Sequence, residues 1–182
     1  MSTYSLSVRP AEPGDGLVIA RINVASWEAA YPHIFAPERL AARWTNVERA
    51  GEWWTERIAS ERPPHRTVIA EQEGKVVGFA DAGPSRDDDA NLQQTGEVNL
   101  IYVLPDRWGR GIGRALMAEV LRRMRDDGFQ DATLWVLDDN PVGRRFYEAG
   151  GWRLDGAVKE GESLETRVLE VRYRREIVAG QT

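Results

Sequence analysis

The sequence predicts an α/β protein in which one mixed sheet carries helices on both faces. Two observations lead to this expectation. In the first half of the chain, two strands flank a short polar turn that contains Glu73 and Gly74, and such a hairpin makes the strands antiparallel neighbours. In the second half, strands alternate with helical segments, which gives crossover connections between strands. The sheet is therefore expected to combine both kinds of pairing.

Length and composition limit the classes of protein to consider. The 182 residues are expected to form a single domain, 1–182, with a core at about 6–175 and a frayed tail at 176–182. The net charge of −5 disfavours a nucleic-acid partner held by general electrostatics. No apolar run is long enough to cross a bilayer, so no membrane partner is expected.

The absence of cysteine narrows the chemistry further. It excludes disulfides, thiolate metal sites and a cysteine nucleophile, and it fits the reducing cytoplasm, where we expect the protein to act. The only histidines, His33 and His65, each stand alone without metal-ligand spacing and are expected to be solvated loop residues. No metal ion is therefore expected.

The N-terminal third is expected to form one strand and three helices. Asp15 stands where a helix N-cap is expected, ahead of apolar residues that recur at helical spacing. Thr45 and Glu48 form a capping-box pattern ahead of a further helical run. The expected elements are, in order, a strand at 6–9, a helix at 16–29, a short helix that begins at Pro37 and carries Leu40 and Trp44, and a helix that ends at about residue 60.

The rest of the chain alternates between strands and helices. The expected elements are strands at 67–71, 76–82 and 97–104, a helix at 113–127, a strand at 132–137, a short helix from Pro141 to about residue 149, and strand-like chain from Trp152 onward. Apolar and charged residues alternate over 169–174, which predicts a half-exposed last strand. The acidic run Asp87-Asp88-Asp89 lies in a polar loop and is expected to be solvated.

The turn that follows the strand at 97–104 is rich in glycine. Gly109, Gly111 and Gly113 lack Cβ atoms where the backbone must bend or approach something closely, and the amides that begin the next helix are unpaired. This arrangement makes a site for an anion, most often a phosphate. A Walker A loop would need lysine and serine or threonine where Arg114 and Ala115 stand, and the spacing of the dinucleotide fingerprint is also absent.

The stretch Trp108-Gly109-Arg110-Gly111-Ile112-Gly113 resembles the pyrophosphate loop of the GCN5-related N-acetyltransferases, although Trp108 stands where that family usually has glutamine or arginine. The segment 134–152 resembles the same family's block of strand, asparagine, helix and tyrosine. The resemblance covers about residues 6–173. It implies a mixed, mostly antiparallel acyl-coenzyme A N-acyltransferase fold and acetyl-coenzyme A as the co-substrate.

The family's site positions carry over to residues of this chain. The resemblance implies that Tyr147 is the general acid for the leaving thiolate and that Glu97 is the base that takes the amine's proton through water, with Asp81 in reserve. Asn140 also suits the role of helix N-cap, and Arg144 that of a surface arginine. The implied coenzyme contacts are Ile101, Tyr102, Val103, Trp108, Gly109, Arg110, Gly111, Ile112, Gly113, Arg114, Asn140, Arg144 and Tyr147.

The acceptor is less defined than the coenzyme. Trp27, Tyr31 and Phe35 are expected either to pack helices onto the sheet or to wall a substrate pocket. The favoured interpretation is direct transfer of an acetyl group to the primary amine of a small molecule. The alternatives are acetylation of a protein N-terminus or lysine, and a non-catalytic domain that binds acyl-coenzyme A. Because dimers are common in the family, a monomer or a homodimer is expected.

Overall fold

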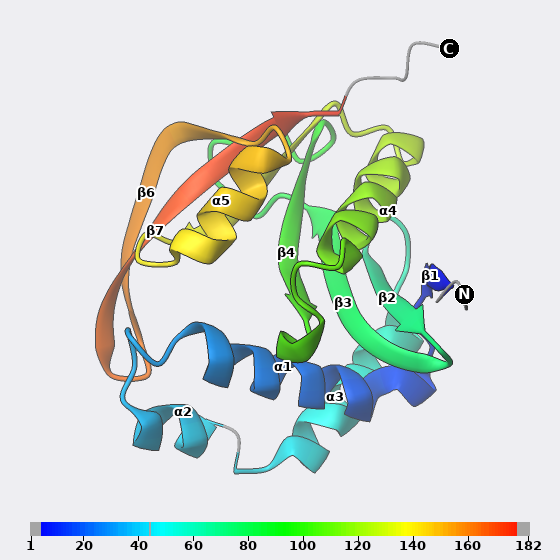
Figure 1. Ribbon diagram of the computed structural model, residues 1–182. Helices are drawn as coiled ribbons and strands as arrows, with labels where there is room; N and C mark the ends of the chain where they lie inside the picture. The colour runs from blue at the N-terminus through cyan, green and yellow to red at the C-terminus, as the bar shows by residue number, and fades with distance from the viewer. Residues whose placement is uncertain (1–4, 44, 178–182) are drawn as a thin grey trace.

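The computed structural model describes residues 5–43 and 45–177. One seven-stranded sheet forms its centre, with the strands in the order β1-β2-β3-β4-β5-β7-β6 (Figure 1). The strands are β1 (Leu6–Pro10), β2 (Arg66–Gln72), β3 (Lys75–Pro84), β4 (Thr95–Val103), β5 (Asp131–Leu137), β6 (Arg153–Ser163) and β7 (Thr166–Glu176). Only β4 and β5 pair in parallel; every other neighbouring pair is antiparallel. The predicted mixed, mostly antiparallel sheet is confirmed.

Helices cover both faces of the sheet. They are α1 (Gly16–Ala30), α2 (Pro37–Arg43), α3 (Val47–Ser60), α4 (Ile112–Asp126) and α5 (Pro141–Ala149), with short 3₁₀ turns at η1 (Pro13–Asp15) and η2 (Pro105–Arg107). On one face, α1 and α3 bury Ile19, Ile22 and Trp54 against Ile69 and Phe79 of the sheet. On the other face, α4 and α5 lie side by side, and β4 is visible between them in Figure 1. No helix of the described chain is long and apolar enough to cross a membrane.

The starts of two helices differ from the prediction. Asp15 is the N-cap residue of α1 as predicted, but its carboxylate makes no capping hydrogen bond; it accepts instead from the Glu12 amide (2.8 Å) and from Arg9 (2.8 Å), which ties η1 to β1. Asn46, not Thr45, caps α3, since its side chain accepts from the amide of Arg49 at 2.8 Å. The predicted helix residue Trp44 lies outside the described residues.

The C-terminal chain, for which only strand-like structure from Trp152 onward was predicted, forms a hairpin of two strands, β6 and β7. Its turn contains Leu164 and Glu165, which adopt positive φ angles of 49° and 56° although neither is glycine. The predicted frayed tail begins too early, because Glu176 ends β7 and the amide of Ile177 donates to the carbonyl of Gln130 at 2.7 Å. Residues 178–182 lie outside the described chain.

Parts of the acidic run and of the last strand are more buried than predicted. Asp87 is only 8% exposed, and Arg172, expected on a solvated face, is only 5% exposed. Arg172 binds Asp87 (3.1 Å), Asp89 (2.6 Å) and Asp155 (2.8 Å). Lys159 joins them through Asp87 at 3.1 Å. These five side chains, which we call the Arg172 cluster, connect the loop before β4 to β6 and β7.

A bulge in β6 supplies one member of the Arg172 cluster. Leu154 pairs with Tyr173 and Val158 pairs with Val171, so β6 has more residues than β7 between these two pairs. The extra residues include Asp155 and Gly156, whose φ of 92° is easily reached only by glycine. The bulge turns Asp155 towards Arg172. Because β6 is the edge of the sheet, the other side of this bulge faces solvent.

Candidate active site

The divergence of β4 and β5 creates the main cavity. The two strands pair only from Thr95 to Glu97 against Asp131 to Thr133, and beyond this point no ladder joins them. A bulge at Asn99 adds to the change in direction, since Asp81 pairs with Leu100 and Ala82 with Val98. The resulting cavity has a volume of about 1510 Å³. A single ligand usually occupies a pocket of about 300–1000 Å³, so this cavity has room for two.

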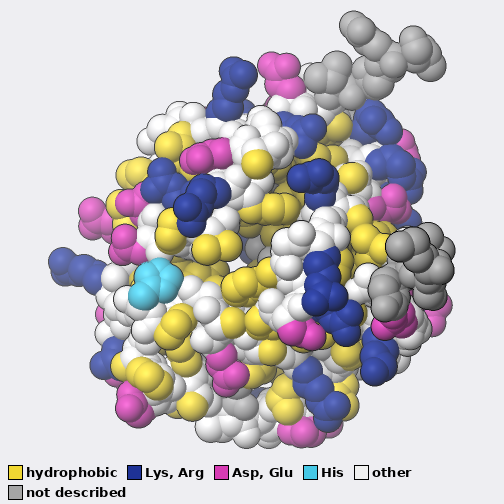
Figure 2. Space-filling model, in the orientation of Figure 1, with side chains coloured by type: hydrophobic (Ala, Val, Ile, Leu, Met, Phe, Trp, Pro, Cys, Tyr) yellow, Lys and Arg dark blue, Asp and Glu magenta, His cyan; other side chains and the backbone are white. Residues whose placement is uncertain are grey.

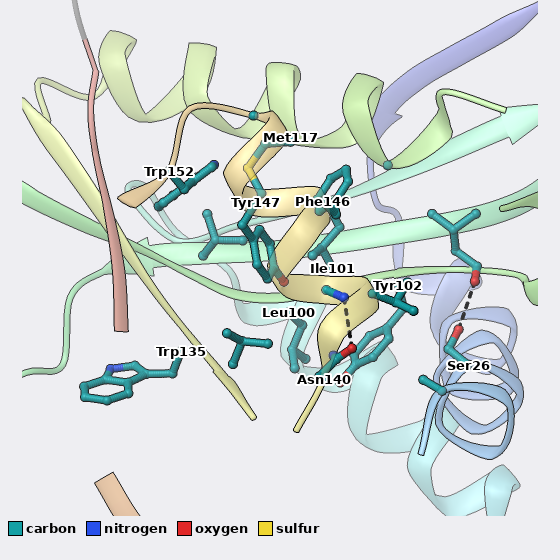
Figure 3. A pocket seen from close by; sticks show the side chains of 18 of the residues that line it. Ser26, Leu100, Ile101, Tyr102, Met117, Trp135, Asn140, Phe146, Tyr147 and Trp152 are labelled. Atoms are coloured by element: carbon teal, nitrogen blue, oxygen red, sulfur yellow. Dashed lines mark hydrogen bonds between the residues drawn. The ribbon is translucent and has the colours of Figure 1, made fainter. Parts of the chain in front are cut away.

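Elements from both faces of the sheet line this cavity. In Figure 2 its opening between α4 and α5 exposes hydrophobic side chains, and basic side chains gather over α4. Figure 3 shows Phe146 and Tyr147 of α5, with Asn140 at the start of this helix, close to Leu100, Ile101 and Tyr102 of β4. At the opposite end, the C-terminal part of α1 and the β6–β7 hairpin complete the wall.

The glycine loop forms one end of the cavity. Gly109 and Gly111 have φ angles of 74° and 81°, and an added Cβ at either would meet open space, so both face the cavity and not packed protein. Gly111 is the N-cap of α4 and provides no capping side chain, which leaves the first amides of α4 available to an anion. A steric constraint favours glycine at position 113, because a Cβ there would lie 3.2 Å from the Phe146 ring.

Trp108 fixes this loop to β4. Its indole Nε1 donates to the carbonyl of Val103 at 2.7 Å, and its ring remains 41% exposed at the cavity. The same carbonyl accepts from the hydroxyl of Ser26 in α1 at 3.1 Å, as drawn in Figure 3. Because Leu104 donates to Val77 of β3, the alternation of an antiparallel ladder turns the amides and carbonyls of Ile101 and Val103 away from β3. Ile101 therefore offers both backbone groups to a ligand in the gap.

Tyr147 lies in the middle of the cavity. Its ring packs against Phe146, Trp152 and Tyr173 with centroid distances of 5.3, 6.3 and 6.1 Å. Within the described chain its hydroxyl makes no hydrogen bond, so the proton is free for a ligand. Burial, followed by the nearby Tyr102, raises the pKa of Tyr147 well above its usual value. The side chain therefore stays a protonated phenol throughout the neutral range.

The position of Asn140 is compatible with both of its expected roles, as the N-cap of a helix and as a contact of the coenzyme. Its side-chain oxygen accepts from the amide of Gly143 at 2.9 Å and so caps α5. Its side-chain amide donates to the hydroxyl of Tyr31 at 3.3 Å, at the boundary between the two ends of the cavity. Burial and the neighbouring Tyr102 and Tyr147 raise the pKa of Tyr31, which also remains protonated.

The two predicted carboxylate bases lie outside the cavity lining. Glu97 is 3% exposed, and its carboxylate accepts from the Arg86 amide at 3.0 Å and from the Arg86 guanidinium at 2.7 Å. Asp81 is 2% exposed and accepts from Arg57 at 2.7 Å and from Asn99 at 2.9 Å. Because both carboxylates are bound by an arginine and neither lines the cavity, these positions disfavour either residue as the base.

We expect Glu97→Gln to affect folding more than catalysis. The amide keeps the shape of the side chain but loses the ion pair with Arg86, and a hydrogen bond to a charged group contributes about 1.5–3 kcal/mol. Because Arg86 is largely exposed, the lower end of that range is expected. Urea unfolding measures the loss. An altered acid limb in the pH profile of kcat/KM would instead support Glu97 as the base.

The other predicted site residues divide into two groups. The cavity is lined by Ile101, Tyr102, Val103, Trp108, Gly109, Gly111, Ile112, Gly113, Arg114, Asn140, Tyr147, Trp27 and Tyr31. Arg110 and Arg144 do not line it, and Arg144 binds the hydroxyl of Tyr173 (3.2 Å) and the carboxylate of Asp138. Phe35 is 1% exposed and packs beneath Trp27 in the core.

Sequence reasoning missed several cavity residues. Ser26, His33, Met117, Trp152 and Glu170 line the cavity, and they come from α1, α4 and β7 and from the chain between elements. His33 is an exposed residue of the turn after α1, as predicted, but it also lines the cavity, and its Nε2 lies 2.7 Å from the carbonyl of Asp139. Trp152 ends the segment 134–152 singled out in the sequence but was given no role there; the other four belong to no local motif, and only the folded chain brings them together. No group of three potential metal ligands occurs in the described residues.

Known proteins share both the sequence pattern and the fold. The family model of the acetyltransferase (GNAT) family matches residues 22–152. An uncharacterized N-acetyltransferase of Bacillus subtilis, YuaI, is 31% identical over 75% of this chain and 74% of its own length. A mycothiol acetyltransferase of Frankia casuarinae is 31% identical over 70% of this chain, which corresponds to only 37% of that longer protein.

Solved structures agree with the fold. The PaiA N-acetyltransferase of Thermoplasma acidophilum, solved with coenzyme A, superposes with a TM-score of 0.73 over 94% of this chain and 99% of its own, at 19% identity. YncA of Salmonella typhimurium, a putative acetyltransferase solved with acetyl-coenzyme A, gives 0.68 over 97% and 96%, at 18% identity.

Proposed function

The chain belongs to the GNAT family of acetyltransferases, and from this premise we propose that it acetylates the primary amine of a small molecule. The enzyme class and the use of acetyl-coenzyme A follow from the family. The observation that carries the proposal is the form of the cavity, which joins an anion-binding loop at one end to an aromatic compartment at the other, with the free Tyr147 hydroxyl between them.

The residues present fit acetyl-coenzyme A. The amides at the start of α4 would hold the pyrophosphate, and Arg107 and Arg114 at the rim would add positive charge. The amide and carbonyl of Ile101 would pair with the pantetheine arm, since the carbonyl of Val103 is already bound by Ser26 and Trp108. When bound there, the coenzyme supplies an acetyl thioester at the gap between β4 and β5.

The chain's own groups would then perform the transfer. The cavity walls orient the acceptor amine towards the thioester, which converts a bimolecular encounter into a reaction between held partners. As the amine nitrogen bonds to the acetyl carbon and the carbon–sulfur bond breaks, Tyr147 would donate its proton to the departing sulfur, and the proton that the nitrogen loses would pass to water and restore the phenol. The raised pKa of Tyr147 keeps its proton in place at neutral pH until then. This route needs no covalent bond to the enzyme.

A small acceptor is favoured by how the second compartment is closed. The hairpin between β6 and β7 contacts the segment after α1, where Leu164 and Val168 pack with Tyr31 and Leu40. Arg39 of α2 donates to the carbonyls of Leu164 and Glu165 at 2.8 and 2.6 Å. These contacts join the first helices to the last strands, where a polypeptide acceptor would be expected to enter, and so favour a small amine.

The coenzyme assignment is tested at Gly111. We expect Gly111→Val to raise the Kd for acetyl-coenzyme A by at least about tenfold, because a β-branched residue is strained at a φ of 81° and its side chain would cover the free amides of α4. Isothermal titration with acetyl-coenzyme A measures the change.

Gly128→Val provides the matched control. Gly128 also has a positive φ, 94°, and open space around an added Cβ, but it does not line the cavity. Gly128→Val should lower the free energy of unfolding about as much as Gly111→Val does, and it should leave the Kd for acetyl-coenzyme A unchanged. Equal Kd values for wild type and Gly111→Val would refute the pyrophosphate assignment.

The overall proposal is tested by screening small amines and short peptides for acetyl-coenzyme A-dependent thiol release. We expect release with amines and little with peptides. Faster release with peptides than with any amine would contradict the small-molecule acceptor. Ligand that binds should also raise Tm by mass action.

A further inference from the structure

Charge is divided between the two ends of the cavity. The cationic side chains on the coenzyme side are Arg107, Arg114, Arg122 and Arg125 of η2 and α4, and Arg175 at the C-terminal end of β7, where Glu176 also lines the cavity. In the acceptor compartment, between α1 and the β6–β7 hairpin, the charged lining residues are Glu162 and Glu170, and no described arginine or lysine lines this part. The phosphates of the coenzyme explain the first group. The two glutamates of the acceptor compartment would be complemented by a positively charged ligand.

Glu170 lies on the inner face of its strand. It pairs in register with Leu137 of β5 and with Lys159 of β6, in the part of β7 that borders the cavity. Leu137 and Val168, two residues before Glu170, both pack against the cluster that contains Tyr31. Since side chains two residues apart on a strand share a face, Glu170 points to the same side as Val168, towards the acceptor compartment.

The nearby cations do not neutralise Glu170. Lys159, its register partner, lies 3.7 Å from the centre of the Trp135 ring and donates to Asp87 at 3.1 Å. Arg172, two residues further along β7, is bound by three aspartates of the Arg172 cluster. Within the described chain Glu170 forms no ion pair and no side-chain hydrogen bond. It is a half-buried carboxylate with its charge still uncompensated.

The walls around this carboxylate also suit a cation. Trp27 and Tyr31 line the same compartment, and the faces of aromatic rings attract positive charge. Glu162 adds a second, more exposed carboxylate at the rim. A carboxylate that lines a cavity without an internal partner is stabilised by a ligand that brings the missing charge.

We propose that Glu170 binds a positively charged group of the acceptor, so that the preferred acceptor carries a second cationic group beside the amine that is acetylated. A linear diamine has this chemistry. The inference rests on the proposed acetyl transfer, and it names Glu170 as the residue that determines specificity for charge.

Three five-carbon amines test this proposal, because they differ mainly in the group at the far end: cadaverine carries an ammonium, pentylamine a methyl group and aminovalerate a carboxylate. Wild-type kcat/KM, followed by thiol release, should fall in that order, by about tenfold from cadaverine to pentylamine. Glu170→Gln should lower kcat/KM for cadaverine by about tenfold, mainly through KM, and should leave pentylamine nearly unchanged.

Glu160→Gln is the matched control. It removes the same charge from the same hairpin at a residue that does not line the cavity, and it should keep the wild-type order. The proposal is overturned if Glu170→Gln retains the preference for cadaverine, if wild type prefers pentylamine, or if none of the three amines is acetylated although acetyl-coenzyme A binds. Failure of the proposed function is distinguishable from all of these, because it would show as faster thiol release with peptides than with any small amine.

Discussion

Tyr147→Phe is expected to lower kcat by about 10²- to 10⁴-fold while acetyl-coenzyme A still binds, since this is the usual contribution of one positioned proton donor. Phenylalanine retains the ring contacts with Phe146, Trp152 and Tyr173. The lost hydroxyl makes no hydrogen bond in the described chain, so Tm should hardly change. Single-turnover kinetics with saturating coenzyme would separate this effect from slow product release.

The pH profile gives the same hypothesis a second test. A donor must be protonated, and burial raises the pKa of Tyr147 above the usual value near 10. The activity that depends on its proton should therefore be fully present at neutral pH and should decline only when the pH exceeds 10. A Tyr147→Phe enzyme with wild-type kcat and an unchanged alkaline limb would show that another group protonates the sulfur.

Arg172→Met is expected to lower the free energy of unfolding by about 3–5 kcal/mol, the usual cost of leaving one member of a buried ion pair without its partner. Asp87, which is 8% exposed, would keep only the half-exposed Lys159 at 3.1 Å as an ionic partner, so the lower end of that range is expected. Asp89 contributes much less, because its side chain is 63% exposed and water can solvate it. Urea denaturation at neutral pH measures the loss.

Two further variants separate the buried charge from other effects of the substitution. Arg122→Met removes an arginine from an exposed pair on α4 and should leave the urea midpoint nearly unchanged. The double variant Asp87→Leu/Arg172→Met removes both buried charges and should be more stable than Arg172→Met alone. A double variant less stable than Arg172→Met would mean that lost packing, and not an unpaired carboxylate, causes the loss.

Local patterns predicted most of the fold. Helical spacing, the hairpin at Gly74 and the glycine loop each depend on neighbouring residues, so one sequence was sufficient to find them. The turn at Leu164 and Glu165 was missed because neither residue is typical of a turn that needs positive φ. Asn46 was missed as a cap because the pattern at Thr45 and Glu48 also fits.

Long-range charge pairing could not be predicted in the same way. Asp87 and Arg172 are separated by 85 residues, and nothing near either one indicates that they meet. A run of aspartates has the composition of a solvated loop, and only the partners supplied by β6 and β7 make burial possible. Glu97 was expected at the cavity because its position matches that of the base in the family it resembles, but its carboxylate binds Arg86, 11 residues earlier, and does not line the cavity.

The bulge in β6 also affects the tendency of the protein to aggregate at high concentration. An unpaired edge strand attracts a strand from another molecule, and here Leu154 and Val158 are 50% and 60% exposed along that edge. The extra residues between them interrupt the row of backbone donors and acceptors, so an incoming strand could not keep its register past this point. The extra residues that place Asp155 beside Arg172 therefore also protect the outer edge of the sheet from aggregation.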